Sequence, residues 1–126
     1  MKVLAMSLLA LALSGCATSP ERLAQREHYY QTIPTCMEGP DCKAKWEAAQ
    51  LWVIHHAAFK IQVANDVLIE TYNATDGDPK LAARVTKEPM GAGKYRILIV
   101  LNCANLFGCV PDAQAAAISF NTAISQ

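Results

Sequence analysis

The chain has 126 residues, a length that accommodates one domain with a small core. It carries 11 Lys and Arg against 11 Asp and Glu, so its formal net charge is zero. That balance argues against a nucleic-acid-binding surface and against an acidic interaction tail. With 52% hydrophobic and 17% charged residues, the chain is expected to fold rather than to stay disordered.

The first fifteen residues have the pattern of an export signal. Lys2 supplies a positive charge, and residues 3–12 form an uncharged apolar stretch that is too short for the ~20 residues needed to cross a bilayer. Leu-Ser-Gly-Cys at residues 13–16 resembles the bacterial lipobox, in which the cysteine thiol takes a diacylglycerol and cleavage falls before it. We therefore expect residues 1–15 to be a signal peptide and Cys16 to be acylated and anchored in the lipid bilayer. An ordinary secretory peptide with an incidental cysteine is the alternative.

Residues 16–35 are expected to be the lipidated cysteine and a tether. Position 17 is Ala rather than the Asp that usually retains such proteins at the inner membrane of Gram-negative bacteria, which favours the inner leaflet of the outer membrane, facing the periplasm. Residues 21–31 could form a short helix, but they lack a clear apolar stripe, and Pro34 ends the stretch. The folded domain is then expected to span residues 36–126.

Four cysteines remain after Cys16, and an even number in an exported chain predicts two disulfides. Three connectivities are possible, and we favour the local one, which pairs the two members of each C-x5-C spacing. The crossed pairings stay open, as does a four-cysteine zinc site, although zinc sites prefer C-x2-C spacing. The cysteines are Cys36, Cys42, Cys103 and Cys109.

The first half of the domain combines a helix and a strand. Apolar residues recur at helical spacing from 42 to about 58, with Asp41 as a plausible N-cap and Trp46 as a core residue. From residue 59 to 71 the period becomes two, as in a half-buried strand. Asn65 and Asp66 interrupt its apolar face. They mark either a bulge or a hairpin turn, and we favour the bulge because the alternation keeps its parity across them.

The second half continues with strands and ends in a helix. Residues 81–88 alternate, and residues 94–103 include an aliphatic run that predicts a central strand buried on both faces. A helix is expected from 113 to about 125 after Pro111 and Asp112. The predicted fold is α+β, a two-layer sandwich in which a helix, an antiparallel three- to four-stranded sheet and a C-terminal helix follow one another.

No residue set forms a catalytic signature, and no cofactor or metal site is predicted. Asp76-Gly77-Asp78 lacks the further ligands of a calcium loop. The candidate binding surface consists of Trp52, His55, His56, Asn105 and Phe107, because the last two lie in a loop between two cysteines. The alternative places the histidines in solvent, Trp52 in the core and Phe107 against the helix.

Several short stretches resemble a group of small proteobacterial lipoproteins with no assigned activity. The resemblance covers most of the mature chain and implies no catalytic residues. It is carried by the Cys36 and Cys42 spacing, Trp46, residues 52–53, 71–73 and 84–89, and the stretch Asn-Cys-Ala-Asn-Leu-Phe-Gly-Cys-Val-Pro at 102–111.

The sequence thus predicts a membrane-anchored envelope lipoprotein that is not an enzyme. Its domain would be a structural or binding module for another envelope component, either a protein or peptidoglycan. The alternative is a periplasmic protein that binds or hydrolyses a small ligand in a pocket between sheet and helices.

Overall fold

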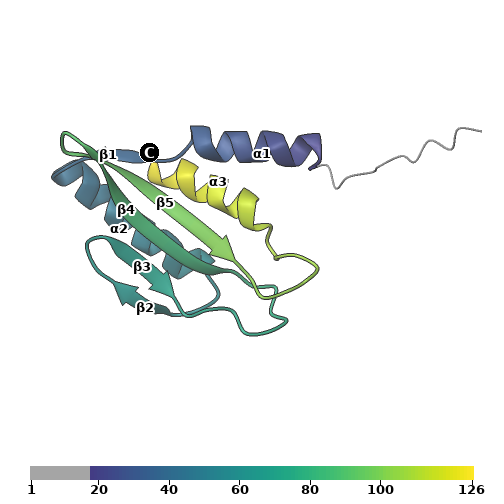
Figure 1. The fold of residues 1–126 in the computed structure, drawn as a ribbon. Coiled ribbons are helices and arrows are strands. Elements are labelled where there is room, and N and C mark those ends of the chain that lie inside the picture. The colour runs from purple at the N-terminus through teal and green to yellow at the C-terminus, as the bar shows by residue number, and fades with distance from the viewer. Residues whose placement is uncertain (1–17) are drawn as a thin grey trace, which may run out of the picture.

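The computed structural model describes residues 18–126. Within them, three helices and five strands follow one another along the chain (Figure 1). The order confirms the α+β class with a C-terminal helix, and the sheet has more strands than expected because β1 was not predicted. The elements are α1 (Pro20–Gln31), β1 (Thr35–Met37), α2 (Pro40–His56), β2 (Ile61–Ala64), β3 (Leu68–Thr71), β4 (Ala82–Gly91), β5 (Lys94–Asn102) and α3 (Ala113–Ile124).

The five strands form one antiparallel sheet in the order β1-β5-β4-β3-β2. Ile69, Val85 and Ile97, which are odd-numbered residues of β3, β4 and β5, point into the core and are fully buried. Helices α2 and α3 pack on this inner face, and Phe120 of α3 is completely buried there. The other face carries partly or fully exposed residues such as Arg84, so the domain has two layers.

The expectation that residues 94–103 are buried on both faces is wrong. In β5, Ile97 and Ile99 are buried, but Val100 is 57% exposed and Leu98 only partly covered. The helices cover a single face of the sheet, so an aliphatic run in its interior does not require a third layer.

Asn65 and Asp66 form a hairpin turn, so the favoured bulge at this site is also wrong. The Asn65 side-chain oxygen accepts hydrogen bonds from the backbone N–H groups of Val67 (3.0 Å) and Leu68 (2.9 Å), and this asparagine turn reverses the chain between β2 and β3. The pairing of these strands is irregular one step earlier, between Ile61 and Val63.

Helix α1 lies within the range expected to be a tether, and it is docked on the domain. Ser19 caps its first turn. The Tyr29 hydroxyl donates to the carbonyl of Ile99 at 3.0 Å, and the side-chain amide of buried Asn121 donates to the Tyr29 carbonyl at 3.1 Å. Burial raises the pKa of Tyr29, with a further contribution from Tyr30. These bonds attach α1 to α3 and to the edge of β5.

Helix α2 crosses the inner face of the sheet and buries both tryptophans. It starts at Pro40, after Gly39, whose φ of 106° lies in the left-handed region that favours glycine. Trp46 is buried and donates its indole N–H to the carbonyl of Asn65 at 2.9 Å. None of the helices that the structure describes has the length and hydrophobicity of a membrane span.

Candidate functional site

Both predicted local disulfides are present. Cys36 pairs with Cys42 at a Cα–Cα distance of 4.9 Å, and Cys103 pairs with Cys109 at 5.6 Å. The first pair links β1 to the first turn of α2, and the second closes the loop between β5 and α3. These four thiols are therefore not available to a metal. In the part of the chain that the structure describes, no three His, Cys, Asp or Glu side chains gather as a metal site would require.

Trp52 does not belong to an exposed surface, so its assignment to the candidate binding surface is wrong. Its side chain is only 6% exposed and meets Phe120 edge to face, with 5.3 Å between ring centroids. His56 stacks on the outside of this indole at 4.2 Å, and its Nδ1 lies 2.8 Å from the Trp52 carbonyl oxygen. His55 and His56 are exposed at the end of α2.

The 103–109 loop has a firmly hydrogen-bonded base. Asn105 donates its side-chain amide to the Gly77 carbonyl at 2.9 Å, while its side-chain oxygen accepts from the Phe107 N–H at 2.8 Å. Backbone bonds between Ala104 and residues 77–78 (2.7 and 3.0 Å) join this loop to the loop between β3 and β4. Asn105 therefore shapes the loop, and the disulfide closes its ends.

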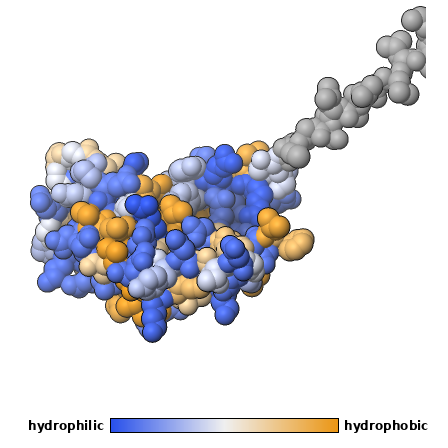
Figure 2. Space-filling view, turned by 60° about the horizontal axis from the view of Figure 1, so that its bottom comes forward, coloured by the Kyte–Doolittle hydropathy of each residue, from blue (hydrophilic) through white to orange (hydrophobic). Residues whose placement is uncertain are grey.

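The tip of this loop is apolar and almost completely exposed. Leu106 and Phe107 are each 99% exposed, and Val110 just beyond the disulfide is 69% exposed. We call Leu106 and Phe107 the apolar tip. Figure 2 shows hydrophobic side chains standing out from the right-hand end of the molecule, where Figure 1 places the loop between β5 and α3. The interpretation that tucked Phe107 against the helix is thus wrong.

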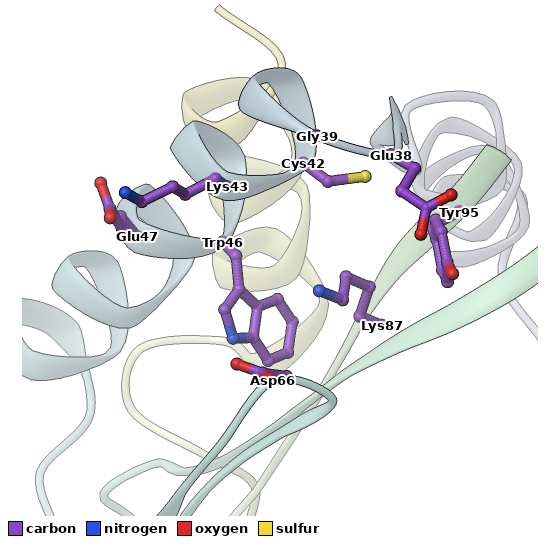
Figure 3. Close-up of a pocket in the computed structure, with 9 residues that line it drawn as sticks. All are labelled: Glu38, Gly39, Cys42, Lys43, Trp46, Glu47, Asp66, Lys87 and Tyr95. Atoms are coloured by element: carbon purple, nitrogen blue, oxygen red, sulfur yellow. The ribbon is translucent and has the colours of Figure 1, made fainter. Parts of the chain in front are cut away.

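A second candidate site is a hollow of about 370 Å³ between the start of α2 and the ends of β4 and β5. Lys87 lies between two aromatic rings there, with its ammonium 5.3 Å from the ring of Trp46 and 5.7 Å from the ring centroid of Tyr95 (Figure 3). Both distances are within the range of cation–π attraction.

The charges around this hollow are mixed. Three acidic residues from different segments line it, together with Lys43 and Lys87. Lys43 and Glu47 point away from the space between Trp46 and Lys87 (Figure 3). Such a lining can accept a small polar molecule. Among the described residues, the hydroxyl of Tyr95 makes no hydrogen bond to a carboxylate there and Cys42 is in a disulfide, so we assign no nucleophilic chemistry to this lining. The carboxylates are Glu38, Glu47 and Asp66.

No known family, curated protein or solved structure matches this chain. The assignment of a function therefore depends on the residues and their geometry alone.

Sequence reasoning identified the 103–109 loop but missed Leu106 as part of its exposed surface. The sequence did contain a signal for it, because an aliphatic and an aromatic residue stand between Asn105 and Gly108, which are typical of a loop. Lys87 was missed as well. Its two aromatic partners come from α2 and β5, and no spacing in the sequence shows that these segments meet.

Proposed function

We propose that this chain is a lipid-anchored protein of the bacterial envelope, whose domain is a non-enzymatic binding or structural module. One observation carries the proposal. The Leu-Ser-Gly-Cys motif at residues 13–16 follows an uncharged stretch of the length of a signal peptide. These residues lie outside those that the structure describes, so the support from this motif comes from the sequence alone.

The two disulfides support export. Disulfides form and persist in oxidising compartments such as the periplasm. Each closes a small loop with a sequence separation of six. A small domain benefits from such cross-links, because its core alone contributes little net stability.

Lipid anchoring agrees with where the described fold begins. The first helical residue, Pro20, is four positions after Cys16, so a fully extended chain between them spans at most about 14 Å. Acyl chains on Cys16 would hold the domain close to the bilayer. Two or three chains anchor far more firmly than one. Ala17 favours the inner leaflet of the outer membrane as the location.

The enzymatic alternative has less support. In the described part of the chain, the four cysteines are in disulfides and the ring of His56 bonds to a backbone carbonyl. These cysteines therefore offer no free thiol as a nucleophile, and one ring nitrogen of His56 is already engaged. An envelope protein or peptidoglycan remains the proposed partner class, with the apolar tip and the Lys87 hollow as surfaces available for contact.

Intact mass spectrometry of the membrane-extracted full chain tests the anchor. We expect a mass that corresponds to cleavage before Cys16 plus acyl chains. Cys16→Ser should lose the acyl mass and leave the chain uncleaved. A matched control, the double variant Cys36→Ser and Cys42→Ser, loses a disulfide but should keep the acyl mass. An unacylated wild-type chain that begins elsewhere would overturn the proposal.

A further inference from the structure

The apolar tip is exposed on a part of the domain that is held in place. The disulfide between Cys103 and Cys109 closes the loop, and Asn105 bridges it to Gly77 and to Phe107. Side chains as large as Leu106 and Phe107 are rarely left fully exposed together, and an exposed apolar pair on an ordered loop marks a contact surface.

The same end of the domain receives the chain from Cys16. At its N-terminal end, α1 is joined to the start of α3 by Arg22, whose guanidinium lies 2.8 Å from the carboxylate of Asp112. Asp112 follows the apolar tip by only five residues. Figure 1 shows the start of α1 and the loop between β5 and α3 at one end of the molecule, away from the hairpin between β4 and β5.

We propose that the apolar tip enters the bilayer in which Cys16 is anchored. This inference depends on the proposed lipid anchor. The lipid surface is the occupant that the geometry favours, because a chain of at most about 14 Å separates Cys16 from Pro20, and Pro20 lies at the end of the domain that carries the tip.

Insertion would be driven by apolar burial rather than by charge. Residues 101–112 contain no lysine or arginine, and Arg22 at this end of the domain is paired with Asp112. Lys80 in the neighbouring loop is accompanied by Asp78, whose backbone carbonyl accepts from Ala104 under the tip. Attraction to anionic headgroups therefore contributes little, and high salt should leave the contact intact. Phenylalanine and leucine are the side chains that amphipathic membrane-binding segments bury.

The test places a tryptophan at the tip of the full, acylated chain. Phe107→Trp is compared with Met90→Trp. Met90 is 52% exposed and lies near the end of β4, at the hairpin that leads into β5. The nine residues of β5 separate the two sites by about 30 Å. Leu106→Trp serves as a second tip variant if the first fails to fold.

Each variant is reconstituted in vesicles of phosphatidylethanolamine and phosphatidylglycerol, doped with phosphatidylcholine brominated on its acyl chains. Fluorescence quenching is measured relative to the wild type, which contains the same buried Trp46 and Trp52. We expect the tip variant to lose emission and shift to the blue, at low and high salt alike. The Met90 variant should behave as the wild type does.

Three results would overturn the inference. In the first, both variants remain unquenched although the mass of the same preparation shows acyl chains. That result would support the acyl anchor but refute the insertion of the apolar tip. In the second, both variants are quenched equally, which would mean that neither end of the domain contacts the membrane in preference to the other. In the third, the tip variant shifts to the blue without quenching by brominated lipid, which would assign the tip to a second copy or another protein. A preparation without acyl chains would refute the proposed function itself.

Discussion

The carboxylate of Asp112 makes two separate interactions, and replacing this residue tests how α1 and α3 are held together. One side-chain oxygen caps α3 by accepting from the backbone N–H of Ala115 at 2.9 Å, and the other pairs with Arg22 at 2.8 Å. Loss of an N-cap costs about 1 kcal/mol, with a range of about 0.5–2. The ion pair is 55% and 39% exposed, so solvent screening limits it to at most about 0.5 kcal/mol.

Three variants separate these contributions. Asp112→Ala should lower the free energy of unfolding by about 1–2 kcal/mol, because both interactions are lost. Asp112→Asn keeps a capping oxygen and Arg22→Ala keeps the whole cap, so each should cost less than about 1 kcal/mol. Urea titration of the full chain in mild detergent measures these values, with the fluorescence of buried Trp46 and Trp52 as the probe.

The cap should also depend on pH. The hydrogen bond from Ala115 and then Arg22 hold the pKa of Asp112 below its ordinary value. A lowered folded-state pKa means that this stabilisation is complete above the unfolded pKa of about 3.9 and is lost as the pH falls through the folded value. The difference between wild type and Asp112→Ala should therefore shrink on acidification below about pH 4. An equal loss in Asp112→Ala and Asp112→Asn, or a difference that stays constant down to pH 2, would refute this account.

Two further predictions concern the core and the Lys87 hollow. Phe120→Ala should cost about 3–5 kcal/mol in the same urea titration, because it leaves a cavity under α3, whereas the exposed control Val100→Ala should change stability by less than about 0.5 kcal/mol. A small effect at Phe120 would contradict the assigned core. Lys87→Gln should cost about 0.5–1 kcal/mol and Lys87→Arg should restore it, since the contact with Trp46 and Tyr95 needs a cation. Equal effects of the two substitutions would speak against a cation–π contribution.

The sequence was most informative where a local pattern decides the structure. The helical spacing predicted α2 at residues 42–58, within two residues of its bounds at each end. The two C-x5-C spacings favoured the disulfides that are present, because a short loop brings its own ends together. The C-terminal helix begins at the predicted residue, where Asp112 is its N-cap.

The errors arise where the outcome depends on contacts between distant segments. The apolar alternation keeps its parity across Asn65 and Asp66 although the chain reverses direction there, so parity did not reveal the hairpin. The deciding bonds from Val67 and Leu68 are not visible in a hydrophobic pattern. Trp52 was predicted to lie on the candidate binding surface. It is buried because α3 covers it with Phe120, and no periodicity within α2 predicts that second neighbour.

Helix α1 has the greatest consequence for how the proposed anchor would work. Because Tyr29, Asn121 and the pair of Arg22 with Asp112 fix this helix to the domain, only the few residues between Cys16 and Pro20 separate the anchor from the folded domain. A tether of at most about 14 Å would keep one end of the domain near the lipid surface. The hairpin between β4 and β5 lies about 30 Å from that end, the length of β5. A partner that contacts the Lys87 hollow, which lies near this hairpin, would therefore meet the protein well clear of the bilayer, while the apolar tip would contact only what lies at the membrane.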